Sequence, residues 1–181
     1  VTASSFDNSV ISGHTALATA PATTDEFLIS DAGTIKRIDY SVLGSTPAFH
    51  AVVGSNQSLS NNTQTKLAAN SETFDSDGKY DNSAYRFTPT VAGKYICYAQ
   101  VNIEGGSSNT LAQISIYKNG SQLNMAIDRY AGDGDVTPNV FATVELDSDD
   151  YVEAFARHNV GSSKNALATS SWFGAYRIVG V

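Results

Sequence analysis

The chain has 181 residues with 18 acidic and 11 basic side chains, which gives a formal net charge of −7. This length suits one domain with its own core and a short extra segment. No basic cluster exceeds the pair Lys36-Arg37, so neither nucleic acid nor a membrane surface is a predicted partner. The single cysteine, Cys97, excludes an intrachain disulfide scaffold, and no apolar run approaches the roughly 20 residues of a membrane span.

Composition also indicates the secondary-structure class. Ser, Thr and Asn together account for 51 of the 181 residues. These side chains compete with helix formation and suit turns and strand surfaces. We therefore predict an all-β protein.

The N-terminal part predicts an arm followed by a small hairpin. Residues 1 to about 24 carry scattered hydrophobes without a period and are interpreted as an extended arm. Two short alternating runs, Glu26 to Ser30 and Thr34 to Tyr40, flank a turn signal at Asp31-Ala32-Gly33. A Gly- and Pro-containing break at Gly44 to Pro47 follows. We expect residues 1–47 to form an attachment segment and residues 48–181 a separate domain.

From residue 48 onward, short strands follow one another without a helical period. The odd positions of Tyr95 to Ile103 form one apolar face, and the run Ala112 to Ile116 alternates in the same way. Asn119-Gly120 is a strong two-residue hairpin signal. The final run, Trp172 to Val181, is apolar on both faces, which predicts a strand buried on both sides.

One motif resembles a known fold family. It reads F-D-x4-Y-D-x5-F-x-P-x3-G-x-Y and extends from Phe74 to Tyr95. Ala48 to Ala51, Tyr117 to Gly120, Leu146 with Asp149 to Val152, and Ser170 to Gly174 match in order. Together they resemble the trimeric jelly rolls of the complement-1q globular head and the tumour-necrosis-factor (TNF) cytokines. The resemblance covers residues 48–181 and implies a jelly-roll β-sandwich that forms a homotrimer.

A second resemblance lies in the N-terminal part. Residues 11–43, which include T-T-D-E-F-L-I-S-D-A-G-T-I-K-R-I-D-Y, resemble a segment that recurs in tail-fibre and other virion proteins of bacteriophages. This resemblance implies that residues 1–47 bind other virion proteins. It also implies a location on the outside of a phage particle, after synthesis in the host cytoplasm.

No pattern typical of catalysis was found. His14, His50 and His158 are isolated from one another and from metal-binding motifs, and are interpreted as surface or core histidines. Cys97 lies on the inward face of a predicted strand, where a thiol behaves as a small hydrophobe. We therefore expect no enzymatic activity and no cofactor.

Several acidic turns are weak candidates for structural calcium. Carboxylates spaced by two residues can share a hard cation, although Asp and Gly are also ordinary turn residues. Asp75 to Gly78 shows this spacing but lies inside the family motif. The remaining candidates are Asp133, Asp135, Asp147, Asp149 and Asp150.

The 18 aromatic residues suggest that some lie outside a single core. Tyr and Trp are favoured at protein interfaces, and several aromatic positions alternate with an apolar face. A two-sided core and a subunit interface remain alternatives for each of them. The predicted trimer-interface residues are Tyr98, Tyr117, Phe141, Phe155, Trp172, Phe173 and Tyr176.

The leading hypothesis is a non-enzymatic homotrimeric component of a tail fibre or spike. Its three distal loops, residues 104–109, 129–138 and 159–165, would bind host surface glycans or proteins, because loops on a β scaffold often carry binding residues. The candidate receptor-facing residues in these loops are Glu104, Asn109, Arg129, Asp133, Asn159 and Lys164. A capsid decoration protein and a secreted cytokine-like or lectin-like module are the alternatives.

Overall fold

The computed structural model describes residues 15, 17–22, 24–40 and 46–178. Contacts divide the chain into two units, Val1–Ser45 and Thr46–Val181. Most of the predicted N-terminal arm lies outside the described residues. In the part that is described, no helix has the length and hydropathy needed to cross a membrane.

All named elements are strands, as the composition predicted. They are β1 (Glu26–Asp31), β2 (Thr34–Asp39), β3 (Ala48–Val52), β4 (Gln57–Leu59), β5 (Thr65–Lys66), β6 (Ser71–Asp75), β7 (Tyr80–Asp81), β8 (Arg86–Phe87), β9 (Gly93–Gln100), β10 (Leu111–Lys118), β11 (Ser121–Arg129), β12 (Asn139–Leu146), β13 (Val152–His158), β14 (Lys164–Ala166) and β15 (Trp172–Arg177).

The first unit contains the predicted hairpin. β1 and β2 pair antiparallel, and the turn between them places Ala32 at φ 50° and Gly33 at φ 86°. Two consecutive positive φ values are typical of the tight turns that join paired strands. Leu28 is 72% exposed and Ile35 is 59% exposed. Within this unit, the hairpin thus has apolar side chains that its own strands do not cover.

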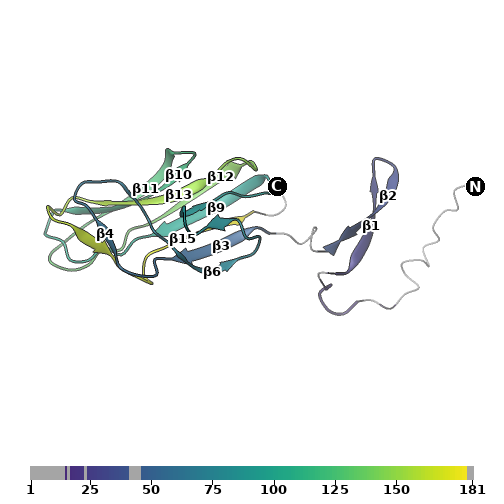
Figure 1. The fold of residues 1–181 in the computed structure, drawn as a ribbon, viewed down its shortest axis with the longest axis horizontal. Coiled ribbons are helices and arrows are strands. Elements are labelled where there is room, and N and C mark those ends of the chain that lie inside the picture. The colour runs from purple at the N-terminus through teal and green to yellow at the C-terminus, as the bar shows by residue number, and fades with distance from the viewer. Residues whose placement is uncertain (1–14, 16, 23, 41–45, 179–181) are drawn as a thin grey trace, which may run out of the picture. The chain divides into compact units, whose positions relative to one another are not determined.

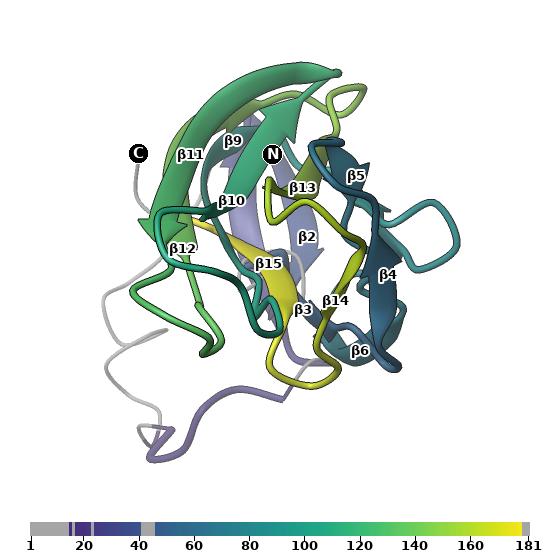
Figure 2. The same cartoon turned by 90° about the vertical axis from the view of Figure 1, so that its left-hand side faces the viewer.

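The second unit is a sandwich of two antiparallel sheets (Figures 1 and 2). One sheet has the order β11-β10-β13-β8-β7, and β5 also pairs with β13. The other has the order β12-β9-β15-β3-β6. Neighbouring strands are mostly distant in sequence, because the chain crosses repeatedly from one sheet to the other. β14 and β4 form a separate two-stranded ladder.

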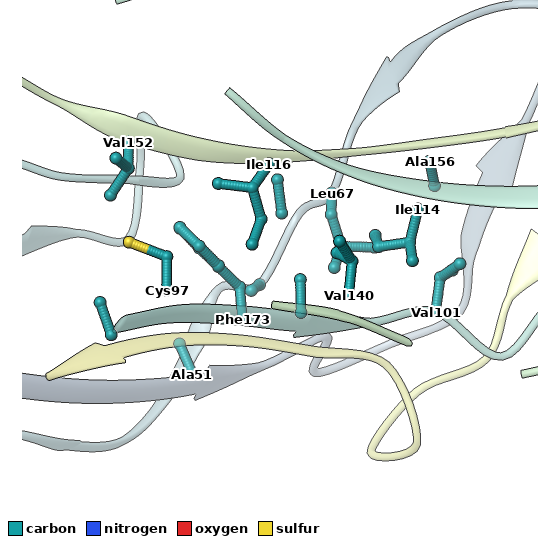
Figure 3. Packing of buried hydrophobic residues seen from close by; sticks show 14 of the residues in the cluster. Ala51, Leu67, Cys97, Val101, Ile114, Ile116, Val140, Val152, Ala156 and Phe173 are labelled. Atoms are coloured by element: carbon teal, nitrogen blue, oxygen red, sulfur yellow. The ribbon is translucent and has the colours of Figure 1, made fainter. Parts of the chain in front are cut away.

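The core lies between the two sheets and consists mainly of apolar side chains (Figure 3). Phe49 is fully buried, and its ring centroid lies 4.5 Å from that of Tyr80, 4.8 Å from Phe87 and 5.0 Å from Phe173. These rings join strands of both sheets. Burying one large apolar side chain contributes roughly 1.5–3 kcal/mol, so this aromatic cluster is a major source of stability.

The alternation seen in the sequence matches the packing. All odd positions from Tyr95 to Ile103 are fully buried, and Asn119 and Gly120 form the hairpin turn between β10 and β11 with φ values of 51° and 76°. The closing strand differs from the prediction of two buried faces. β15 lies in the middle of its sheet, between β9 and β3, but Tyr176 on its outward face is 44% exposed. Within one chain, only the face with Phe173 is fully buried.

Candidate functional site

The outward face of the five-stranded sheet carries a row of aromatic residues. Strand pairing places Phe141, Tyr98, Gly174, His50 and Phe74 beside one another on β12, β9, β15, β3 and β6. Side chains of directly paired residues lie on the same face of a sheet. The row therefore crosses the whole width of the sheet.

Gly174 at the centre of this row makes room for the Tyr98 ring. A Cβ atom at position 174 would lie 2.4 Å from Cζ of Tyr98, so any larger residue there would force the Tyr98 ring to move. The tyrosine can therefore lie across β15 and approach His50 on the next strand. The Tyr98 hydroxyl and His50 Nδ1 are 3.4 Å apart.

The rings around Tyr98 form one connected cluster. The ring centroid of Tyr98 lies 5.6 Å from that of Trp172, 5.9 Å from that of His50 and 6.2 Å from that of Tyr176. His50 in turn lies 5.7 Å from Trp172 and stacks on Phe74 at 6.2 Å. These distances fall in the range of attractive aromatic pairs. We call the surface formed by His50, Phe74, Tyr98, Phe141, Trp172 and Tyr176 the aromatic face.

The aromatic face is both exposed and uncharged. Phe141 is 59% exposed, Phe74 50% and Tyr176 44%. Partial burial lowers the pKa of His50, which favours its neutral form, and raises the pKa of the Tyr98 hydroxyl. A connected aromatic surface without charge at its centre is typical of the buried part of a protein interface. Such a surface can bind another apolar surface.

The structure divides the seven predicted interface residues into three groups. Tyr98, Phe141, Trp172 and Tyr176 belong to the aromatic face. Phe173 is 1% exposed and points into the core of its own subunit, because neighbouring residues on a strand point to opposite faces.

The other two predicted residues lie on the six-stranded sheet. Tyr117 on β10 and Phe155 on β13 pack against each other with a centroid distance of 4.5 Å. They are half-buried and take part in a different surface from the aromatic face. Sequence reasoning could identify aromatic strand positions but not the sheet to which each strand belongs.

Two members of the aromatic face were not predicted. From the sequence, His50 is an isolated histidine and Phe74 is a residue of the family motif. The sequence does contain a signal for His50, because this polar residue lies between two apolar residues, Phe49 and Ala51. Both of these are fully buried in the structure. Alternation along β3 therefore places His50 on the outward face. For Phe74, the break in register between His50 and Ala51 obscures this signal.

The structure brings the three predicted receptor-facing loops together at one end of the sandwich (Figure 2), although Arg129 is the last residue of β11 and Lys164 the first of β14. Arg129 donates a hydrogen bond to the backbone oxygen of Asn109. Oε1 of Glu104 accepts hydrogen bonds from the backbone and side chain of Asn165, next to Lys164. Oδ1 of Asn159 accepts a hydrogen bond from the backbone of Leu111, where β10 begins. Their role in receptor binding stays a prediction.

The acidic turns use their carboxylates for local hydrogen bonds. Asp135 accepts a hydrogen bond from the backbone of Gly105, and Asp150 forms an ion pair with Lys118 at 2.7 Å. Hydrogen bonds from Lys118 and Asn119 and from the backbone of Asp147 lower the pKa of Asp150 to about 2. Within the described ranges, no group of three or more potential ligands is placed to hold a metal ion.

Two of the remaining potentially reactive side chains, His158 and Cys97, are fully buried. His158 is fully buried, with Nε2 3.0 Å from the backbone oxygen of Leu59. Cys97 is fully buried in the core, where burial raises its pKa to about 12 (Figure 3). A thiol with such a pKa is protonated at neutral pH and is a poor nucleophile. His14 lies outside the described residues.

Comparison with solved structures identifies the fold. The chain is similar to the globular domain of a zebrafish complement 1qA protein, with a TM-score of 0.55, 16% identity, and 75% of this chain and 99% of that chain covered. It is also similar to murine APRIL at pH 5.0, with a TM-score of 0.56, 16% identity, and 74% of this chain and 100% of that chain covered. No protein-family model and no curated protein sequence matches the chain.

These similarities confirm the predicted fold class. The all-β sandwich of residues 46–178 is a jelly roll of the complement-1q and TNF type. At 16% identity, the similarity establishes the fold alone. The predicted bacteriophage context rests on residues 11–43, and neither comparison bears on it.

Proposed function

We propose that this chain is a non-enzymatic binding and structural module that assembles as a homotrimer on the outside of a bacteriophage particle. In this proposal, the aromatic face joins the three jelly rolls, and residues 1–47 attach the trimer to other virion proteins. The loops at the end of the sandwich then contact the host surface. We propose a role in a tail fibre or spike as the leading hypothesis and capsid decoration as the alternative.

The observation that carries the trimer is the exposure of the aromatic face. Soluble monomers rarely expose connected apolar patches larger than a few hundred Å². Phe74, Phe141 and Tyr176 are each at least 44% exposed within one subunit. A closed symmetric assembly buries such a surface in every copy without leaving an open end. The resemblance to the trimeric jelly rolls supports three copies.

The N-terminal unit supports attachment to a larger assembly. An isolated two-stranded hairpin is only marginally stable in water, and its apolar side chains favour a partner. Leu28 and Ile35 are 72% and 59% exposed in β1 and β2. The resemblance of residues 11–43 to a segment of phage virion proteins suggests that this partner belongs to the particle.

The trimer is tested by measuring the mass of the full chain in solution. Light scattering at micromolar concentration is expected to give about three times 19.1 kDa. Tyr176→Asp, which places a charge on the aromatic face, is expected to give a folded monomer. Met125→Asp is the matched control, because Met125 is 47% exposed on β11 of the other sheet and its substitution leaves the trimer intact. A wild-type monomer, or dissociation by Met125→Asp alone, contradicts the proposed interface.

The location is tested on intact phage particles. Antibody-gold labelling of the chain is expected at the tail, and a chain that lacks residues 1–47 is expected to remain a trimer but to be missing from particles. Labelling over the whole capsid would instead favour decoration. Secretion of the chain into culture medium without particles would contradict the virion role and favour a cytokine-like or lectin-like module.

A further inference from the structure

A shallow cleft lies at the β7 edge of the six-stranded sheet, which is a different sheet from the one with the aromatic face. Its volume is about 290 Å³, near the lower end of the range for small-molecule sites. None of its residues belongs to the three loops discussed above. The cleft is lined by Gly78, Lys79, Tyr80, Asp81, Arg86, Thr88, Thr90 and Ser148.

The floor of the cleft is fixed by the core. Tyr80 is 6% exposed, stacks on Phe49, and donates a hydrogen bond from its hydroxyl to the backbone oxygen of Ala69 at 2.7 Å. The backbone of Thr88 donates a hydrogen bond to Lys79 at 3.1 Å, which holds the two walls together. A ligand in this cleft would therefore meet a surface that is already ordered, which reduces the entropic cost of binding.

Two cationic side chains line this cleft without an ion-pair partner. Four ion pairs occur in the described part of the chain, and none of them includes Lys79 or Arg86. Asp81 pairs with Arg86 across the β7-β8 ladder, but its Oδ1 accepts hydrogen bonds from Ser83 and Ala84 in the adjacent turn. Asp81 also lines the cleft and interacts electrostatically with Arg86, but neither cation forms an ion pair within the described ranges, so both can contact an anionic ligand.

The Arg86 guanidinium has a defined position. It lies over the Tyr151 ring, 5.0 Å from its centroid. Stacking of this kind fixes the plane of the guanidinium and leaves the N–H groups at its edge free to donate. A planar carboxylate can accept two of these hydrogen bonds at once.

Hydroxyl groups provide the remaining polar lining. Thr88, Thr90 and Ser148 come from two separate segments, and no side-chain hydrogen bond within the described ranges uses their hydroxyls. Each hydroxyl can donate one hydrogen bond and accept two. The cleft therefore combines a carboxylate-binding group, a second cation and several groups that match the hydroxyls of a sugar.

From these contacts we propose that the cleft binds a carboxylated sugar residue, such as the uronic acid unit of an acidic polysaccharide. Arg86 binds the carboxylate, Lys79 provides the second positive charge, and the three hydroxyls bind the ring hydroxyls. This inference deepens the proposed attachment role by naming a ligand class for a site outside the terminal loops. The binding of one sugar to one subunit does not require the trimer.

Charge and valency define the expected strength of binding. The chain has a net charge of −7, so long-range attraction does not favour an acidic polymer. Binding to a single sugar should then be weak and should decrease further with salt. Three clefts on one trimer would strengthen binding to a polymer through multivalency.

The probe is free glucuronic acid, with glucose as the neutral control, measured on the full chain by saturation-transfer NMR. We expect glucuronic acid to bind at least about tenfold more tightly than glucose, because charge-assisted hydrogen bonds are the stronger ones. Arg86→Lys keeps the charge but removes the planar fork, and Lys79→Ala removes the second cation. Both are expected to weaken binding, whereas the control Lys94→Ala, at an exposed position on β9 outside the cleft and the loops, leaves it unchanged. Thermal melting verifies that each variant is folded.

Three results would overturn the proposal. They are equal binding of glucose and glucuronic acid, unchanged binding in a folded Lys79→Ala, Arg86→Ala double variant, and inorganic phosphate displacing glucuronic acid at a lower concentration than glucuronic acid itself requires. The last result would indicate a general anion site. Repeating the titration with Tyr176→Asp separates the two proposals, because a monomer that still binds glucuronic acid supports the cleft independently of the trimer.

Discussion

The outward faces of the two sheets both carry aromatic residues, but only one is covered by its own chain. On the six-stranded sheet, Gln64 donates a hydrogen bond to the Tyr117 hydroxyl at 3.0 Å, and the Lys66 ammonium lies 5.9 Å from the Phe155 ring centroid. On the five-stranded sheet, Phe141 and Tyr176 remain 59% and 44% exposed. The two faces therefore differ mainly in whether another segment of the chain covers their aromatic residues, and less in how many aromatic residues they carry.

This difference indicates where a partner would add most stability. A segment that includes β5 already provides polar and charged contacts to Tyr117, Phe155 and Glu153. The aromatic face has no comparable cover among the described residues. An exposed row also exists on β11, where Leu123, Met125 and Ile127 are 42–47% exposed. That row is confined to one edge strand, whereas the aromatic face spans the whole five-stranded sheet.

The largest expected effect separates the core from the aromatic face. Phe173 and Tyr176 are both on β15, but Phe173 is 1% exposed and Tyr176 is 44% exposed. Phe173→Ala leaves a cavity beside Phe49 and should lower the free energy of unfolding by about 3–5 kcal/mol. Tyr176→Ala should cost the isolated subunit less than about 1 kcal/mol. Denaturant unfolding measures both values, and equal losses would contradict this assignment of the two faces.

The sequence was sufficient to predict the fold. Alternation identified the inward positions of β9 and β10, and ordered motif matches identified the jelly roll. These signals are local or follow chain order. These local signals could not predict the register shift between His50 and Ala51, because a register shift depends on the facing strand β6.

The candidate site was predicted only in part, for a related reason. Trp172, Phe173 and Tyr176 are all large aromatics on one strand, and composition alone does not reveal which of them point inward. The covering of Tyr117 and Phe155 by residues 64–66 depends on contacts between positions distant in sequence. The role of Gly174 could not be predicted for the same reason, because this glycine makes room for the ring of Tyr98, which lies on another strand.

The second prediction concerns the ion pair that covers the six-stranded sheet. Lys66 Nζ lies 2.6 Å from Oε1 of Glu153, whose side chain is only 7% exposed. Lys66→Met leaves this nearly buried carboxylate without its partner and should cost about 1–3 kcal/mol. Adding Glu153→Gln should recover part of the loss. Denaturant unfolding of the two variants measures the recovery, and no recovery would indicate that Lys66 acts mainly by packing on Phe155.

The third prediction concerns the shape of the aromatic face. Gly174→Ala puts a Cβ against the outer end of the Tyr98 ring, which can swing away from β15. We expect a loss of about 1 kcal/mol or less in unfolding free energy, because the ring is at the surface. The displaced ring should nevertheless weaken the proposed trimer, and light scattering on dilution measures this. Gly132→Ala is the control, since a Cβ there meets nothing within 4 Å.

The smallest expected effect is a pH dependence centred on His50. Desolvation by burial lowers the pKa of His50 in the folded chain. The unfolded chain, with a histidine pKa of about 6.5, therefore binds more protons between that value and the lower folded pKa. The stability contributed by neutral His50 is complete above about pH 6.5 and is lost as the pH falls towards the folded pKa. The half-buried position of the ring keeps this effect smaller than those of the packing variants.

His50→Phe tests this assignment because it keeps an aromatic ring beside Phe74 and Trp172 and removes the titrating group. The difference in unfolding free energy between the wild type and this variant should change between about pH 7 and 5, in favour of the variant at the lower pH. Glu72 on β6 and the hydroxyls of Tyr98 and Tyr176 are ionisable groups near this region, and all three are retained in the variant. The proposed trimer buries the ring further, so the same pH change should shift the concentration at which the wild type dissociates. A difference that stays constant across this pH range would show that burial of His50 is not coupled to its protonation.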